Sequence, residues 1–495
     1  VQHNMQAANA NRMLNVTTGQ QAKSTEKLSS GYRINRAADD AAGLTISEKM
    51  RKQIRGLDRA STNAQDGVSA VQTAEGALTE VHSMLQRMNE LATQAANGTN
   101  STTDRKAIQD EVDQLSTEID RVSETTKFNE TYLLKGDQGT KTINLEAHDA
   151  GLKGTLTNNG DGTATFTMDA LKGGDKISIG GKQYTIGGTT EQDVKDFLKK
   201  NGVEDKADST FSITSGNKTV TYKYYAAKAD VATGGNTTYG YDAGWYNEAD
   251  APTTSTTTGD QATVNAKKKD SYEAFATQSG TFTAAGKTLE KATITDANPT
   301  DGVDDKDSTV ISVQKAYELA GKELLKANQI GDTEGHASVK NADDSDLAYN
   351  AGNGSFKINL AQAKVASTLS FNLHVGADAD LTNKIQVNID AMDSASLGIK
   401  GLNVNDKNGT AGTYAIDAIS DAISKVSSQR SSLGAVQNRL EHTINNLDNV
   451  VENTTSAESR IRDTDMAKEM VNYSKNNILA QAGQSMLAQA NQSNQ

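Results

Sequence analysis

The chain has 495 residues, a formal net charge of −13 and no cysteine, and 35% of its residues are hydrophobic. The excess of acidic residues argues against binding to nucleic acid or to an anionic membrane surface, because both need clustered Lys and Arg. The lack of cysteine excludes thiolate catalysis and Cys-ligated metals. No stretch reaches the roughly 18 apolar residues that a membrane-spanning helix needs, so we expect no membrane insertion. The first residues also lack the pattern of a cleavable signal peptide, which taken alone predicts a cytosolic protein.

The first 30 residues predict a weak helix. Its apolar positions are Met5, Met13, Leu14, Val16 and Leu28, and mainly small or polar residues separate them. Such a stripe is too poor in apolar side chains to hold a helix by itself in water. We therefore expect this segment to fold only against a partner.

A long helix is predicted from about Leu44 to Asn97. Apolar residues recur there every seven positions in two interleaved series, the pattern of a helix that lies along another helix: Val71, Leu78, Leu85, Ala92 and Ala74, Val81, Met88, Ala95. At the rise of an α-helix, this one would be roughly 80 Å long. Asn97-Gly98 predicts a left-handed stop. A second helix follows, with an apolar stripe at Ile108, Val112, Leu115, Ile119 and Val122.

The middle of the chain, 136–367, is predicted to be an insert of one or two mostly β modules. It contains both prolines, the single tryptophan and most of the glycine. The segment 176–186 alternates polar and apolar residues around a Gly-Gly pair, which predicts an antiparallel hairpin. Short helices are predicted at about 190–200 and 312–328.

The last segment mirrors the first. A seven-residue repeat predicts a helix from about 413 to 460, with Ile419, Val426, Leu433, Leu440 and Leu447 as its seam. Residues 465–495 return to a weak helix, whose apolar positions include Met466, Met470, Ile478, Leu479, Met486 and Leu487. We therefore expect a mainly α fold: a long antiparallel bundle of heptad helices formed by both termini, with small β-hairpin elements and the inserted mostly-β region.

Templates for catalysis or metal binding do not occur in the sequence. The six histidines are isolated and no H-E-x-x-H string is present. Paired carboxylates such as Asp39-Asp40 have no spacing that indicates acid–base chemistry. We therefore expect no enzymatic activity, no cofactor and no metal site.

Two charged strings connect the terminal helices to the long ones. Ser30-Gly-Tyr-Arg-Ile-Asn-Arg-Ala-Ala-Asp-Asp-Ala-Ala-Gly43-Leu44 carries Arg33, Asn35, Asp39 and Asp40, and Arg462-Asp-Thr-Asp-Met-Ala-Lys-Glu-Met470 carries Arg462 and Asp463. Both strings closely resemble the bacterial flagellins. Further matches occur in the same order as in that family: Ile119-Asp-Arg-Val122, Lys127-Phe-Asn-Glu130, Phe371-Asn-Leu-His-Val-Gly-Ala377, Ser396-Leu-Gly-Ile399, Ile478-Leu-Ala-Gln-Ala482 and Met486-Leu-Ala-Gln-Ala-Asn491. The resemblance covers about 1–135 and 368–495 and does not extend to the insert.

The resemblance implies a structural subunit of the extracellular flagellar filament. Flagellins leave the cell unfolded through the flagellum-specific type III apparatus, which needs no cleaved signal. Their partners are further copies of the same chain, an export chaperone at the C-terminal segment, and the filament cap and hook-junction proteins. Flagellins usually begin with Met and end in a short apolar tail, so we expect the native chain to extend beyond this sequence.

The resemblance also assigns regions and polymerisation residues. Residues 1–35 and 465–495 would form the inner core of the polymer, 36–135 and 368–464 its outer core, and 136–367 its exposed surface. Polymerisation and the joints between helices would depend on Arg33, Asn35, Asp39, Asp40, Arg462, Asp463, Met466, Met470, Ile478, Leu479, Met486 and Leu487.

One stripe of the long helix resembles the part of flagellin that the innate immune Toll-like receptor for flagellin recognises. The matching string is Leu85-Gln-Arg-Met-Asn-Glu-Leu-Ala-Thr-Gln94, in which Arg87, Leu91 and Gln94 share one helix face. The resemblance implies receptor contacts by Gln86, Arg87, Leu91, Gln94 and Glu111. The sequence leaves an alternative open: Arg87 and Glu111 form an ordinary surface ion pair, and Leu91 belongs to the core.

Two other functions stay open at this point. A fibrous adhesin or tail-fibre-like binding protein would also combine heptad helices with a Thr-rich β insert, although the charged joints at both ends favour flagellin. An enzyme within the insert is the second alternative, and activity on casein or carbohydrate, with and without chelator, would reveal it.

Overall fold

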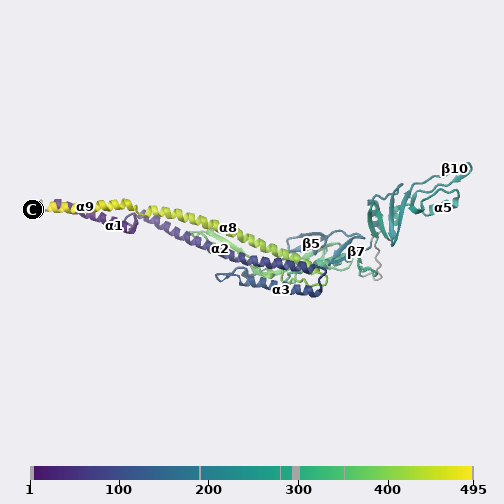
Figure 1. Ribbon diagram of the computed structural model, residues 1–495, viewed down its shortest axis with the longest axis horizontal. Helices are drawn as coiled ribbons and strands as arrows, with labels where there is room; N and C mark the ends of the chain where they lie inside the picture. Colours follow the sequence, from purple (N-terminus) through teal and green to yellow (C-terminus); the bar gives the residue numbers. More distant parts are fainter. Residues whose placement is uncertain (1–4, 189–190, 279, 292–300, 350–351, 493–495) are drawn as a thin grey trace.

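The computed structural model describes residues 5–188, 191–278, 280–291, 301–349 and 352–492. The molecule is elongated, with the terminal helices at one tip and the inserted region at the other (Figure 1). Five long helices form the rod: α1 (Met5–Ser30), α2 (Ala41–Ala96), α3 (Thr102–Thr125), α8 (Thr410–Arg462) and α9 (Met466–Gln492). Helix α2 packs along α8, and α1 packs along α9. The predicted mainly α fold, with both termini in one bundle and a β-rich insert, is confirmed.

The heptad seams form the core of the rod. Every member of the two series in α2 is fully or almost fully buried, as are all five seam residues of α8. In α3, Ile108, Val112 and Ile119 are buried against the same core, whereas Leu115 and Val122 are only partly buried. The seven-residue period therefore identified the buried face correctly, because each seam side chain lies over a neighbouring helix.

The predicted left-handed stop after α2 is wrong. Asn97 has φ −68°, and Gly98 is not among the residues with positive φ. Polar side chains take over the role of a left-handed residue: Arg105 Nε donates to Ala95 O, and Asn100 Nδ2 donates to Gln94 O. These bonds satisfy carbonyl groups that the last turn of a helix leaves without intrahelical partners.

Small antiparallel ribbons flank the helices. Strand β19 (Leu369–His374) pairs with β20 (Lys384–Ile389), so the small β-hairpin elements expected beside the helices are present, and the string 371–377 begins in one of them. Strand β3 (Asp137–Asn144) pairs with β18 (Gln362–Ser367). This ribbon brings Asp137 opposite Ser367, at the two ends of the predicted insert. Two short elements complete the rod: the β1–β2 hairpin (Lys127–Phe128 and Thr131–Tyr132) and helix α7 (Ser394–Leu397).

The insert contains two modules. The inner module has the sheets β16-β17-β5-β4 and β15-β7-β6, both in contact with α6 (Val313–Asn328). Its strands are β4 (Gly154–Asn158), β5 (Thr163–Met168), β6 (Lys176–Ile179), β7 (Lys182–Ile186), β15 (Val310–Ile311), β16 (Ser338–Asn341) and β17 (Ser355–Asn359). The predicted hairpin at 176–186 is β6–β7, and its Gly180-Gly181 turn has positive φ at both residues.

The outer module is built on the five-stranded sheet β12-β9-β8-β13-β14. Its core gathers Phe211, Trp245, Phe275 and Phe282. Its elements are α4 (Glu191–Lys200), β8 (Thr210–Ser215), β9 (Lys218–Tyr225), β10 (Val231–Thr233), β11 (Asn236–Thr238), β12 (Gly244–Asn247), α5 (Thr258–Ala266), β13 (Gly280–Ala284) and β14 (Lys287–Lys291). The helices predicted near 190–200 and 312–328 are confirmed as α4 and α6.

The inner module is fastened to α8. Tyr414 belongs to the core of that module, and its hydroxyl donates to Glu323 Oε2 over 2.8 Å. Burial raises the pKa of Tyr414, and the neighbouring Glu323 carboxylate raises it further. A second contact lies seven residues further along α8, where His148 Nε2 is 3.7 Å from Asp421 Oδ2. The module therefore rests on the rod and is not free of it.

Candidate functional site

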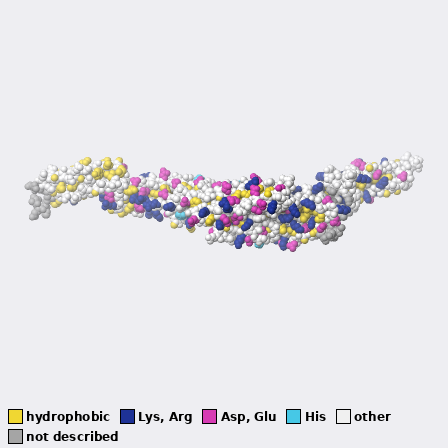
Figure 2. Space-filling model, turned by 60° about the horizontal axis from the view of Figure 1, so that its bottom comes forward, with side chains coloured by type: hydrophobic (Ala, Val, Ile, Leu, Met, Phe, Trp, Pro, Cys, Tyr) yellow, Lys and Arg dark blue, Asp and Glu magenta, His cyan; other side chains and the backbone are white. Residues whose placement is uncertain are grey.

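The paired terminal helices bury very little of their own surface. Of the described residues of α1 and α9, only Ser24, Asn476 and Ala480 are buried. Their large apolar side chains stand mostly in solvent, with exposed fractions of 77% for Met5 and 67% for Ile478. The same holds for Met13, Val16, Met466, Met470, Val471, Leu479 and Met486, whereas Leu487 is half-buried. Figure 2 shows hydrophobic side chains over this end of the molecule, with charged ones gathering further along the rod.

Such an apolar surface is unusual for a protein that stays monomeric. Soluble monomers rarely expose contiguous apolar patches of this kind, and larger ones mark interaction sites. Because α1 and α9 already cover each other along one side, what remains exposed is available to a further chain.

The two charged strings meet at one level of the rod. Arg33 N donates to Arg462 O over 2.6 Å, and Thr464 N donates to Gly31 O over 3.0 Å. Tyr32 and Asp463 form an antiparallel bridge there. The break between α1 and α2 therefore lies beside the break between α8 and α9, and backbone hydrogen bonds connect the two segments.

Side chains fix this double joint. The Arg462 guanidinium contacts Glu48 Oε1 at 2.7 Å and lies over the Tyr32 ring, 4.9 Å from its centroid. The hydrogen bond from Arg462 lowers the pKa of Glu48. Asp463 Oδ2 accepts a hydrogen bond from the Ser459 hydroxyl.

The remaining joint residues shape the turn before α2. Asp39 Oδ2 accepts from the backbone N–H of Arg36 and of Asn35, and the first of these bonds lowers the pKa of Asp39. Asp40 caps α2, because its Oδ1 accepts from Gly43 N over 2.8 Å. Asn35 and Asp39 therefore act locally, whereas Arg33 reaches across to the C-terminal string through a hydrogen bond to Ile461 O.

The predicted receptor stripe is only partly on the surface. Gln86, Arg87, Gln94 and Glu111 are exposed, and Arg87 Nε donates to Glu111 Oε1 over 2.8 Å. Leu91 is 2% exposed and belongs to the core of the rod, as in the alternative that the sequence leaves open, so its side chain does not lie on the surface with the other four. The reason is that α3 and α8 both pack on α2, and the buried face is wider than a two-helix seam.

Sequence reasoning missed one buried arginine. Arg105 is 2% exposed at the start of α3. It donates to Ala95 O and Asn97 O at the end of α2, and to Asp406 O and Lys407 O before α8. Its signal in the sequence is weak, because an arginine in the first turn of an amphipathic helix usually faces solvent.

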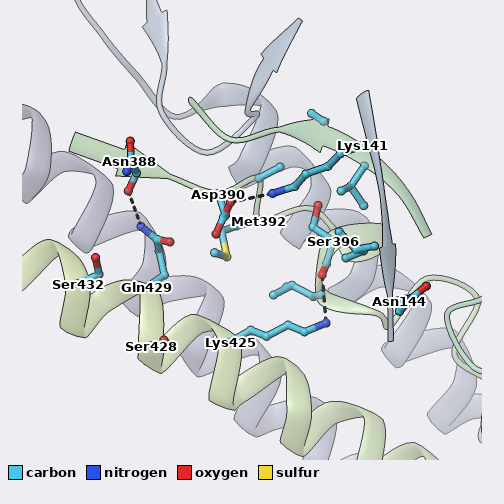
Figure 3. A pocket seen from close by; sticks show the side chains of 15 residues that line it. Lys141, Asn144, Asn388, Asp390, Met392, Ser396, Lys425, Ser428, Gln429 and Ser432 are labelled. Atoms are coloured by element: carbon cyan, nitrogen blue, oxygen red, sulfur yellow. Dashed lines mark hydrogen bonds and ion pairs between the residues drawn. The ribbon is translucent and has the colours of Figure 1, made fainter. Parts of the chain in front are cut away.

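A cavity of about 510 Å³ lies between the β3–β18 ribbon, β20 and α8. Lys141 and Lys425 enter it from opposite sides (Figure 3). Lys141 Nζ contacts Asp390 Oδ1 at 3.1 Å, and Gln429 Nε2 donates to Asn388 O over 3.1 Å. Lys425 Nζ reaches Ser396 O at 3.4 Å, and burial lowers the pKa of Lys425.

These polar groups pair with one another and include no nucleophile–base couple. Among the described residues, no group of three or more His, Asp or Glu side chains is placed to hold a metal ion. In the same part of the chain, no helix is both long and apolar enough to cross a membrane.

Known proteins resemble this chain over its whole length. The bacterial flagellin N-terminal helical region matches residues 1–139, and the C-terminal helical region matches residues 416–495. A flagellin from Clostridium tyrobutyricum is 36% identical over 498 aligned positions, which span 100% of both chains. The chain belongs to the flagellin family.

Other flagellins agree with this assignment. Polar flagellin A of Vibrio parahaemolyticus is 33% identical, with 100% of this chain and 96% of that one covered. A solved structure of FliC from Burkholderia pseudomallei is 17% identical, covering 75% of this chain and 99% of that one, and its TM-score of 0.24 is too low to add to the argument. The family resemblance inferred from the two joint strings is confirmed.

Proposed function

We propose that this chain is the subunit of an extracellular flagellar filament and that it polymerises through α1 and α9. The observation that carries the proposal is the exposed apolar surface of these two helices, of which Met5 and Ile478 are the clearest examples. Burying a side chain of this size contributes about 1.5–3 kcal/mol, so a few such contacts per neighbour are enough for assembly. The family supports a structural filament protein, a role that needs no catalytic group.

Seeded elongation tests this function directly. Monomer mixed with short filament fragments should lengthen them, and negative-stain electron microscopy should show the growth. A folded chain that never joins the seeds would contradict the proposal.

Before assembly, the same exposed apolar surface favours aggregation. We propose that an export chaperone covers the segment 465–495 inside the cell and that the chain leaves through the type III apparatus. Filament cap and hook-junction proteins would meet the same helices at the two ends of the polymer. Support comes from the exposure of large apolar side chains on α9, among them Met470, Ile478 and Met486.

The insert is expected to be dispensable for assembly. We propose that the insert begins at residue 136 and ends at residue 367. The β3–β18 ribbon supports these boundaries, because it pairs Asp137 with Ser367. Replacing 146–360 by a short Gly/Ser linker keeps the Asn144–Gln362 pair and turns the ribbon into a hairpin. Electron microscopy should show filaments that are thinner than those of the parent chain.

Some stability should be lost in this variant, because Tyr414 loses its partner Glu323 and becomes exposed. Removing only the outer module, 191–291, is the matched control, since it leaves the contacts with α8 intact. A linker variant that folds but stays monomeric would show that the insert takes part in polymerisation.

We further propose that exposed residues on α2 and α3 bind the Toll-like receptor for flagellin. The exposed candidates are Gln86, Arg87, Gln94 and Glu111, whereas Leu91 is buried. Arg87→Ala should weaken binding of the monomer by about 1–3 kcal/mol, the range for truncating an interface arginine. Surface plasmon resonance against the receptor ectodomain measures the change.

Arg121→Ala is the matched control, because Arg121 is also exposed on the rod and pairs with Glu118 on its own helix. Its affinity for the receptor should equal that of the parent. Equal affinity of the Arg87→Ala variant would mean that Arg87 and Glu111 form only a surface ion pair.

A further inference from the structure

The terminal helices carry the exposed methionines of the chain. Five of its ten methionines lie in α1 and α9, and their exposed fractions run from 51% to 77%: Met5, Met13, Met466, Met470 and Met486. The other five, in the rod and the inner module, are buried or half-buried: Met50, Met84, Met88, Met168 and Met392. An oxidant in solution therefore meets the thioether groups of the terminal helices first.

Methionine supplies much of the apolar surface that we assign to polymerisation. Nine large apolar side chains of α1 and α9 are exposed, and five of them are methionines. Met466 and Met470 are four residues apart at the start of α9, so they lie on one face of that helix. A chemical change confined to methionine would therefore alter more than half of these side chains.

Mild oxidation is a change of this kind. The sulfur of methionine attacks one oxygen of hydrogen peroxide, the O–O bond breaks, and the leaving hydroxide takes the remaining proton and becomes water. Sulfur loses two electrons to the peroxide, and a sulfoxide remains. The chain has no cysteine, whose thiolate would otherwise compete for the oxidant.

A sulfoxide opposes the burial that polymerisation needs. Oxidation converts a flexible apolar side chain into a polar one and disrupts methionine-rich interfaces. A subunit joins its neighbours by burying these side chains, and each S–O group would then lose its hydration, which is unfavourable. The buried Met88 and Met392 belong to the core of the rod, so the fold itself is protected while the terminal helices react.

We propose that the exposed methionines of α1 and α9 form a reversible oxidation switch that stops a subunit from polymerising while they are sulfoxides. This inference rests on the proposed polymerisation through these two helices. The reverse step needs a thiol reductant and a methionine sulfoxide reductase: two thiols become a disulfide, and the sulfoxide oxygen leaves as water. Subunits within a filament would react more slowly than monomers, because neighbouring chains would cover the same side chains.

Brief treatment of the folded monomer with hydrogen peroxide, ended by catalase, tests the switch. Peptide mass spectrometry should find sulfoxide at the five terminal methionines before it appears at Met88, Met168 and Met392. The critical concentration for seeded elongation should rise at least about tenfold. Incubation with methionine sulfoxide reductases A and B and dithiothreitol should restore the untreated value.

A variant without the terminal methionines shows whether they carry the effect. It combines Met5→Leu, Met13→Leu, Met466→Leu, Met470→Leu and Met486→Leu, because leucine is close to methionine in volume and has no sulfur. Whatever the critical concentration of this variant, peroxide should leave it unchanged. The matched control combines Met50→Leu with Met84→Leu on α2, and peroxide should raise its critical concentration as it does for the parent.

Elongation of the treated parent at its untreated critical concentration, with sulfoxide mapped at the terminal methionines, would overturn the proposal. A peroxide effect on the five-leucine variant as large as that on the parent would overturn it too. If that variant did not elongate, the reductase step on the parent would decide, since a loss that persists after reduction is not a reversible switch. An untreated parent that never elongates would instead contradict the filament function, and even oxidation of all ten methionines in the monomer would contradict the selective site.

Discussion

Deleting residues 1–30 or 465–495 should abolish filament elongation and leave a soluble, still helical monomer. The rod core made by α2, α3 and α8 closes on itself, because every seam residue in α2 and α8 is buried within one chain. The terminal helices lack such closure, and their apolar side chains are exposed while the chain is alone. Seeded elongation followed by light scattering measures the loss, and far-UV circular dichroism checks the helices.

Single substitutions make the test sharper. Ile478→Ser should raise the critical concentration for elongation about tenfold or more, since removing one large apolar contact costs at least about 1.4 kcal/mol. Val231→Ser is the control, because Val231 is also exposed but lies in the outer module. In the monomer, amide hydrogens of α1 and α9 should exchange faster than those of α2 and α8. If the amide hydrogens of α1 and α9 exchanged as slowly as those of α2 and α8, the proposal that the terminal helices need neighbouring subunits would be contradicted.

Arg105→Met should destabilise the rod by about 3 kcal/mol. The substitution leaves carbonyl oxygens of Ala95, Asn97, Asp406 and Lys407 without their donor at a site where the side chain is buried, and each unpaired acceptor costs about 1–3 kcal/mol. The cost should stay below the sum, because neighbouring groups and water recover part of it. Chemical denaturation followed by the helical circular dichroism signal measures the change.

Arg121→Met provides the comparison on the same helix. Arg121 is exposed and contacts only Glu118, one turn away, so its loss should change the free energy of unfolding by less than about 1 kcal/mol. If both variants unfolded at the same denaturant concentration, the hydrogen bonds of Arg105 to α2 and to the segment before α8 would not stabilise the rod.

The sequence was most informative where one period repeats over many turns. Positions such as Leu78 and Leu433 could be assigned to a buried seam because a heptad repeat has few other interpretations. The same rule left the burial of Leu91 open, because α2 packs against α3 as well as α8, and a heptad pattern for one partner does not give the full width of the buried face. Joint residues were found through the strings they share with flagellins, but only the structure shows that Arg33 and Arg462 lie together.

Other features have no local pattern to find. The end of α2 contains Asn97-Gly98, which favours a left-handed stop, but a tertiary contact from Arg105 satisfies the same carbonyl groups and overrides that preference.

The pairing of α2 with α8 also sets the order of events in folding. The Ser61 hydroxyl donates to Asp448 across 387 positions of sequence, and the whole insert lies between the two helices. Contacts this distant in the chain give a high contact order and slow folding, because the closing entropy must be overcome before any of them forms. The α2–α8 core of the rod therefore cannot close while the last hundred residues of the chain are still held elsewhere. A subunit delivered end first through a narrow channel would stay unfolded by its own topology until nearly all of it had emerged, whereas the outer module could fold as soon as it was free.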